Sequence, residues 1–224
     1  LHPSEMKDRL AVALGQRGAV ASLVGARGEA LASFSEAVKL QRELVSGESS
    51  TYQPDLATSL LNLGIVLGDA NRTAEALAAT TEAAKLFEDL ASERPDLHLP
   101  SWAKSLLNLG IRLSVLKEHE RALSVIRRAV DLYRGLTESR PAAFQPELAA
   151  ALNSLGQVLY ALDLRDEAVE AAEEAVKKLM PYRLWFDGRF RQDMERAVQN
   201  YRRLADASRR MVNQELMDLL ELAG

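Results

Sequence analysis

The hexapeptide Ser-Leu-Leu-Asn-Leu-Gly occurs twice in this chain, at residues 59–64 and again 46 residues later at 105–110. A weaker copy, Ala-Leu-Asn-Ser-Leu-Gly, follows at 151–156 after the same interval. A fixed interval of this size is typical of repeat arrays, in which each unit buries its apolar face only against its neighbours. This spacing constrains the fold of the 224-residue chain more than any other feature of the sequence.

Helices are the expected element of each repeat. Aromatic residues make up only 5% of the chain, whereas strands are typically enriched in aromatic and β-branched residues. Leucines recur at helical spacing ahead of each glycine. A glycine and two alanines then follow at fixed intervals, and we expect these small residues where the two helices of a pair approach closely. The three copies are Gly64, Ala76, Ala83; Gly110, Ala122, Ala129; and Gly156, Ala168, Ala175.

Prolines and glycines predict where the helices begin and end. The first helix of each pair is expected to open at Pro54, Pro100 or Pro146, because proline fits the first turn. The second helices are expected to stop at Pro95 and Pro141. The predicted division places repeats at about 1–52, 53–98, 99–144 and 145–182, followed by a C-terminal cap at 183–224.

The pattern resembles the tetratricopeptide repeat family, whose signature places bulky residues around Leu-Gly and then two alanines. Here it is Leu60-x2-Leu63-Gly64-x2-Leu67, followed by Ala76 and Ala83. The 46-residue unit is longer than the family's usual length of about 34 residues and is similar to long-repeat members of the kinesin light chain type. We expect the extra residues mostly in the second helix and the connecting loop.

The resemblance implies an all-α fold: a right-handed superhelical solenoid of antiparallel helix pairs, with four repeats and C-terminal capping helices in a single domain over 1–224. It also implies that the first helices line a concave groove, which binds an extended peptide or a helical segment of a partner protein. At the positions expected to face that groove, the chain has Thr58, Leu61, Asn62, Ile65, Lys104, Leu107, Asn108, Ile111, Asn153, Gln157 and Tyr160.

Asn62 and Asn108 occupy the same place in consecutive repeats. A carboxamide both donates and accepts hydrogen bonds, so a row of them could pair with the main chain of an extended ligand. The same side chains could instead bond a neighbouring helix and hold the repeats in register. Both interpretations stay open. The fourth copy has Ser154 at this place, so we expect the row to weaken there.

The chemistry-bearing residue types argue against an enzyme. The chain has no cysteine, which excludes disulfides, thiolate metal sites and cysteine nucleophiles. Its three histidines, His2, His98 and His119, are interpreted as surface residues. The glycines form no phosphate-binding motif. We therefore expect no catalytic residues, no metal and no cofactor.

The region 177–210 differs in chemistry from the rest of the chain. It carries ten basic and four acidic residues. Basic residues beside aromatic ones can bind nucleic acid, which is one alternative function. The favoured interpretation is a cap that covers the end of the array, because the terminal repeats of such an array must be atypical. The net charge of −4 implies no general affinity for nucleic acid. The interleaved aromatic residues are Tyr182, Trp185, Phe186 and Phe190.

A last apolar stripe predicts a helix over 208–222. This helix could cap its own chain, or it could lie in the groove of a second copy and make a dimer. Self-association through the C-terminal helix is therefore a second possible contact, beside a protein or peptide ligand in the groove.

The leading functional hypothesis is a non-catalytic scaffold that binds a protein or peptide. The alternative is an oligomerisation or sensor arm of a larger signalling protein, because the chain starts at Leu1 rather than Met. No apolar run is long enough for a membrane span, and no signal-peptide pattern is present. The absence of cysteine fits a reducing compartment, so we expect a cytoplasmic location and no membrane partner.

Overall fold

The fold is described from a computed structural model that defines residues 3–47, 50–182 and 188–221. Within these ranges the chain is all-α, with ten α-helices, two short 3-10 helices and no strand. This confirms the expected fold class. The chain divides into two compact units, residues 1–116 and 117–224, here called the first unit and the second unit. Each is described by itself.

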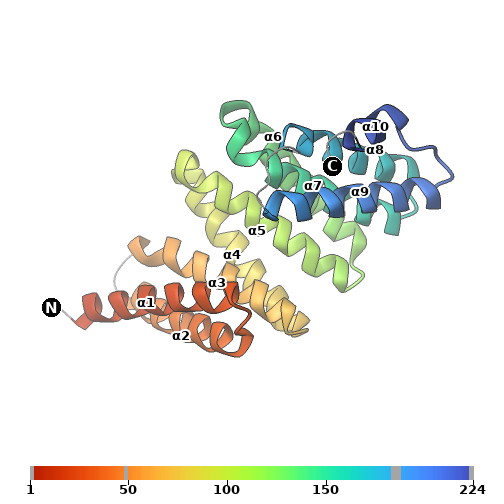
Figure 1. The fold of residues 1–224 in the computed structure, drawn as a ribbon. Helices are drawn as coiled ribbons and strands as arrows, with labels where there is room; N and C mark the ends of the chain where they lie inside the picture. The colour runs from red at the N-terminus through yellow and green to blue at the C-terminus, as the bar shows by residue number, and fades with distance from the viewer. Residues whose placement is uncertain (1–2, 48–49, 183–187, 222–224) are drawn as a thin grey trace. The chain divides into compact units, whose positions relative to one another are not determined.

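In the first unit, consecutive helices pack against each other in chain order (Figure 1). The odd-numbered helices, which are the first helices of successive pairs, also contact one another: α1 with α3, and α3 with α5. They therefore form one layer, and the second helices form the other. The elements are α1 (Pro3–Leu23), α2 (Arg27–Gly47), a 3-10 turn (Ser50–Tyr52), α3 (Gln53–Asp69), α4 (Thr73–Glu93) and α5 (Pro95–Val115).

The second unit follows the same scheme. Helix α7 packs against α6 and α8, and α9 packs against both α8 and the first helix of the preceding pair, α7 (Figure 1). The elements are α6 (His119–Ser139), α7 (Pro141–Ala161), α8 (Arg165–Leu179), a 3-10 turn (Met180–Tyr182), α9 (Gly188–Ala207) and α10 (Gln214–Glu221).

The glycines lie where the sequence predicts close helix contacts. A Cβ atom added at Gly64 would lie 2.5 Å from the Thr80 side chain and 3.3 Å from the Ala76 carbonyl oxygen. One added at Gly156 would lie 2.9 Å from the carbonyl oxygen of Ala168. The distances of 2.5 and 2.9 Å are too short for a carbon atom, so a larger residue at either position would force a shift where α3 approaches α4 and where α7 approaches α8.

The turns within the helix pairs share one backbone device. A residue with positive φ stands in each turn: Gly25 (75°), Asn71 (59°), Lys117 (62°), Asp163 (62°) and Arg209 (54°). Successive positions lie 46 residues apart, which is the length of one repeat. The left-handed conformation ends the first helix and reverses the chain. Only the first of the five positions is a glycine, so composition alone does not reveal the series.

The series corrects the predicted C-terminal helix. We expected a helix over 208–222, but Arg209 is the left-handed residue of a turn, and α10 starts at Gln214. Its start is marked by Asn213, whose side-chain Oδ1 accepts a hydrogen bond from the Leu216 backbone N–H at 3.1 Å. That contact is an N-cap. In register terms, α9 and α10 form a fifth helix pair with a short second helix.

The expected helix starts at Pro100 and Pro146 are wrong. Helices α5 and α7 begin at Pro95 and Pro141, each after a single connecting residue, and the later prolines lie inside them. A proline this close to the helix start removes one backbone hydrogen bond. Pro95 and Pro141 occupy the first helical position, where proline is favoured, so each helix begins more than one turn before the later proline. The extra residues of the long repeat therefore extend the first helices as well, and the connectors are minimal.

Ion pairs link second helices across neighbouring repeats. Arg127 and Arg134 of α6 pair with Glu167 and Glu174 of α8 at 2.8 and 2.9 Å. In the first unit, Arg42 of α2 pairs with Glu82 of α4. These side chains are largely exposed, so each pair contributes roughly 0–1 kcal/mol. These ion pairs lie on the layer of second helices, whereas the groove is expected on the layer of first helices.

Candidate functional site

Four places on the first helices recur every 46 residues and were expected to face a ligand. In the first unit these places have apolar, amide, hydroxyl and basic side chains. In the second unit nearly all of them have polar side chains. In chain order the four series are Thr58, Lys104, Ala150, Arg196; Leu61, Leu107, Asn153, Gln199; Asn62, Asn108, Ser154, Asn200; and Ile65, Ile111, Gln157, Arg203.

Most of the predicted residues of the first unit have accessible side chains. Thr58 and Lys104 are exposed. The four residues one turn further along α3 and α5 are half-buried: Asn62, Ile65, Asn108 and Ile111. This set can present amides and apolar groups to a ligand from two adjacent first helices.

Leu61 and Leu107 lie differently from the rest of that set. Their side chains are only 4% and 9% exposed. Leu61 belongs to a core cluster with Leu60 and Phe87. These two leucines therefore stabilise helix packing, and Ile65 and Ile111 are the more accessible apolar side chains of the row.

The two asparagines of the first unit do not bond a neighbouring helix. Asn108 Nδ2 donates to the Lys104 carbonyl of its own helix at 2.9 Å. Asn62 has no side-chain hydrogen bond within the residues that the structure defines. Their carboxamide oxygens thus keep their capacity to accept hydrogen bonds from a ligand.

The second unit contains a pocket at the corresponding places of α7 and α9. Its volume is about 380 Å³. Every lining residue has a polar side chain: Asn153 and Gln157 from α7, and Arg196, Gln199, Asn200 and Arg203 from α9. Two of the four recurring places on α7 and all four on α9 contribute to this list, so the repeat register itself assembles the pocket.

A directed chain of hydrogen bonds runs across the pocket. Arg203 Nη2 donates to Asn200 Oδ1 at 2.9 Å, and Asn200 Nδ2 donates to Asn153 Oδ1 at 2.6 Å. A guanidinium only donates, so it fixes the orientation of the first amide, which in turn fixes that of the second. The amide nitrogen of Asn153 remains available as a donor. The pocket therefore contains hydrogen-bond donors that match acceptor oxygens in their chemistry.

Two guanidinium groups add positive charge to this site. Arg203 Cζ lies 5.7 Å from the ring centroid of Tyr160, within the range of a cation–π contact. Arg196 Nη2 pairs with Asp193 Oδ1 of the same helix at 3.1 Å. Both contacts restrict side-chain motion, which lowers the entropy lost when a ligand binds. Tyr160, predicted as a groove residue, lies beside the pocket through this contact.

Sequence reasoning missed Arg196, Gln199, Asn200 and Arg203. The sequence contains a signal for them, because these residues lie three repeats after Thr58, Leu61, Asn62 and Ile65. The amide row therefore does not stop at Ser154, whose hydroxyl donates to the Ala150 carbonyl of its own helix. It resumes at Asn200.

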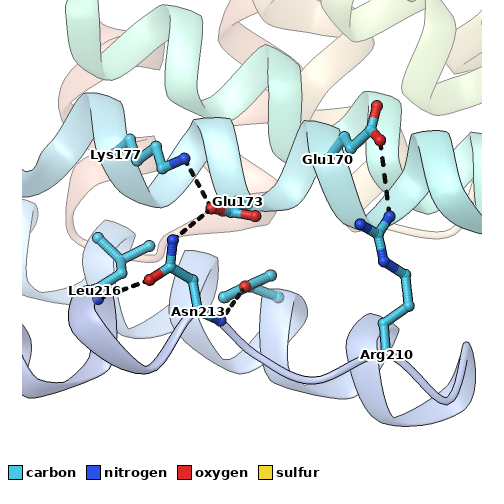
Figure 2. Close-up of polar contacts among 7 residues, drawn as sticks. Glu170, Glu173, Lys177, Arg210, Asn213 and Leu216 are labelled. Atoms are coloured by element: carbon cyan, nitrogen blue, oxygen red, sulfur yellow. Dashed lines mark hydrogen bonds and ion pairs between the residues drawn. The ribbon is translucent and has the colours of Figure 1, made fainter.

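Polar contacts hold α10 against α8 and α9 of its own chain (Figure 2). Asn213 Nδ2 donates to Glu173 Oε1 at 3.0 Å, and the backbone N–H of Asn213 donates to the Tyr201 hydroxyl at 2.7 Å. Lys177 Nζ pairs with the same Glu173 oxygen at 2.7 Å. Hydrogen bonding from Lys177, above all, lowers the pKa of Glu173 below its usual range.

Several basic side chains of the region 177–210 lie in such local pairs. Besides Lys177 and Arg196, Arg210 lies 3.7 Å from Glu170 (Figure 2). It also lies 3.5 Å from Asp166. Nucleic-acid binding by this region stays a prediction. The aromatic residues Trp185 and Phe186 lie outside the described residues, as does the side chain of Phe190.

Two further features bear on function. No group of three or more His, Asp or Glu side chains that could hold a metal ion is found among the described residues. No helix in the described part of the chain combines the length and apolar character needed to cross a membrane.

Comparison with known families gives two matches. Residues 148–178 match the tetratricopeptide repeat model. Residues 2–52 and 44–107 match the model of anaphase-promoting complex subunit 5. Comparison with curated protein sequences finds no significant match.

Solved structures with similar folds cover almost the whole chain. The TPR-like repeats of a chain described as a kinesin light chain from Podosopora anserina are 17% identical, with a TM-score of 0.64, over 97% of this chain and 95% of that one. BtubC from P. vanneervenii is 17% identical, with a TM-score of 0.61, over 97% and 89%. A Rap protein complexed with Competence and Sporulation Factor is 16% identical, with a TM-score of 0.54, over 94% and 61%.

Proposed function

With a tetratricopeptide repeat at residues 148–178 and the long-repeat solenoid fold of the kinesin light chain type, we propose that this chain is a non-catalytic scaffold that binds a segment of a partner protein. The fold class itself is that of protein-interaction scaffolds. The proposal adds the binding mode: a peptide or helical segment lies along the first helices, at the recurring places described above.

The pocket between α7 and α9 is the observation that carries this proposal. Its side chains are held in place by one another, as the bonds of Asn200 to Asn153 and Arg203 illustrate. A preorganised set of donors in a concave site favours binding, because little side-chain entropy remains to be lost. The Rap structure provides an example of this fold class in complex with a factor.

The chemistry of the pocket narrows the ligand class. Carboxylate and main-chain carbonyl oxygens are the acceptors that match an asparagine N–H and two guanidinium groups. We therefore propose that a segment with an acidic side chain occupies the second unit. On the first unit, Asn62 and Asn108 would pair with the main chain of a segment bound there, while Ile65 and Ile111 supply apolar contact.

A pair of fluorescein-labelled peptides tests the ligand class. The two peptides share an extended sequence and differ only in carrying Glu or Gln at alternate positions. We expect the Glu peptide to bind more tightly in fluorescence anisotropy titrations, and high salt to reduce the difference. In R203Q the affinity for the Glu peptide should fall about tenfold, since hydrogen bonds to charged groups are typically worth 1.5–3 kcal/mol.

R202Q is the matched control, because Arg202 is an exposed neighbour on α9 that does not line the pocket. Equal losses in R203Q and R202Q would show that net charge alone attracts the peptide, and the pocket would lose its assigned role. For the first unit, the double change N62A and N108A should weaken binding while the helical circular dichroism signal persists.

A further inference from the structure

Arg112 of α5 interrupts an apolar series at its own repeat position. It lies one repeat after Val66 and one repeat before Val158. The other later first helices bury apolar side chains here: Val66 of α3 is 5% exposed, Val158 of α7 1% and Leu204 of α9 0%. A side chain that served only helix packing would be better as valine, because removing a charged group from water costs free energy. The exception points to a role other than packing.

The guanidinium group of Arg112 fills a notch in the backbone of α3. The notch exists because residue 68 is glycine. A Cβ atom added at Gly68 would overlap Arg112 Nη1 and would lie 2.5 Å from its Cζ. Gly68 is the last residue but one of α3, so the positive charge also lies near the negative end of that helix dipole. A larger residue at position 68 would therefore displace the guanidinium group from this place.

The described part of the chain supplies no acceptor for this guanidinium group. Arg112 makes no hydrogen bond or ion pair with the described residues, and its Nε is buried without an acceptor. The side chain is half-buried, and Nη1 and Nη2 are not enclosed. A guanidinium group only donates, so its partners must be acceptors such as carboxylate or phosphate oxygens. Arg112 is thus positioned to donate to an oxyanion from outside the chain.

The second unit has a guanidinium group at the matching place. Gly68 lies two repeats before Tyr160, which was expected at the groove. Arg203 of the following first helix lies 5.7 Å from the Tyr160 ring centroid, just as Arg112 of the following first helix lies over Gly68. The two arginines occupy different register positions, because Arg203 corresponds to Ile111. Each unit therefore places one arginine at this end of its expected groove by a different residue.

We propose that Arg112 is an oxyanion-binding residue of the first unit, and that its ligand is a carboxylate group of the partner segment. The inference rests on the proposed function and adds to it an acidic contact on the first unit. Nη1 and Nη2 offer paired donors, which match the two oxygens of a carboxylate. Asn108 lies one helical turn before Arg112 on the same side of α5. An amide and a guanidinium group can therefore bind neighbouring groups of one segment.

Two variants of the full chain test this role with the Glu and Gln peptides described above. R112V removes the guanidinium group and inserts the residue that α3 and α7 have at this place, so the helical circular dichroism signal should persist. G68A keeps the charge, but its methyl group takes the position of the guanidinium group. Both are made in R203Q, which weakens the pocket of the second unit. There R112V should lower the affinity for the Glu peptide about tenfold and spare the Gln peptide. G68A should give a smaller loss in the same direction.

Inorganic phosphate is a probe that needs no peptide. At constant ionic strength it should raise the melting temperature of the unmodified chain more than that of R112V, because a ligand of the folded state stabilises it. Equal increases in the two chains, or a preference for the Glu peptide that survives R112V, would overturn the role of Arg112. If phosphate stabilisation depends on Arg112 but neither peptide binds, Arg112 remains an oxyanion site and the proposed function alone is contradicted.

Discussion

The two units place opposite chemistry on matching positions of their first helices. The first unit has Leu61 and Leu107 where the second has Asn153 and Gln199, and Ile111 where the second has Arg203. The glycines that allow close helix contact recur in both units. Packing positions therefore repeat while surface positions diverge. In the proposed function, the two units therefore provide two different candidate surfaces, an amide and isoleucine surface and a donor-rich pocket.

The largest expected effect tests whether matching positions have different structural roles. L61A should lower the free energy of unfolding by about 2–5 kcal/mol, because it removes a buried side chain from the core. N153A, at the same place in the second unit, should cost only about 1 kcal/mol for its hydrogen bond. Urea denaturation followed by circular dichroism measures both. Similar losses of stability in the two variants would contradict the assignment of Leu61 to the core and of Asn153 to the pocket.

The glycines should respond alike in both units. G64A and G156A should each cost about 1–3 kcal/mol, since the added methyl group meets α4 or α8 at the short distances described above. G135A is the control. Gly135 lies within α6, and nothing approaches within 4 Å of an added Cβ atom. There we expect a gain of up to about 1 kcal/mol, because alanine is the better helix former. If G135A instead lowered stability, the losses in G64A and G156A could not be assigned to the close helix contacts.

Asn108 of the first unit and Asn200 of the second unit occupy the same repeat position but make different hydrogen bonds. N200A should cost about 1–2 kcal/mol, because Asn200 is 8% exposed and its loss leaves the Asn153 oxygen without its donor. N108A should change stability by less than about 0.5 kcal/mol, since that amide bonds only its own helix. A double-mutant cycle with N153A should show coupling for Asn200. Additive effects would show that the hydrogen bond between Asn200 and Asn153 does not hold α7 and α9 in register.

The smallest expected effect concerns the C-terminal helix pair. The pKa of Glu173 is lowered, mainly by its hydrogen bond with Lys177. A carboxyl group with a lowered pKa stabilises the fold above its unfolded pKa, and this contribution is lost as the pH falls through the folded value. Hydrogen exchange of α10 amides, corrected for intrinsic rates, should therefore accelerate modestly in acid. E173Q should flatten this pH dependence, and an unchanged profile in E173Q would assign it to other groups.

Sequence spacing predicted the helix pairs and their tight contacts because both depend on local residue types. The glycines and alanines report contact distance directly, and the breaks at Pro95 and Pro141 follow from proline chemistry. Pro100 and Pro146 misled the prediction, because Pro95 and Pro141 already occupy the first helical position and each helix continues through the second proline. The burial of Leu61 was equally hidden, since it depends on how far α4 covers α3.

The candidate site was predicted only in part. Asn153, Gln157 and Tyr160 were expected at the groove, but their partners on α9 were not. Arg202 stands at the glycine position of the fifth repeat, and the region was interpreted as a cap rather than as a further helix of the groove. The bonds among Arg203, Asn200 and Asn153 depend on side-chain geometry that no spacing rule contains.

Contacts within each unit join helices that are neighbours in the chain or one pair apart. This locality has a kinetic consequence. Closing a contact never requires a long loop to be ordered first, so the entropic barrier to folding should be low. Structure can form at one helix pair and spread to the next. During synthesis, each pair can therefore pack on the one already made, before the remainder of the unit has left the ribosome.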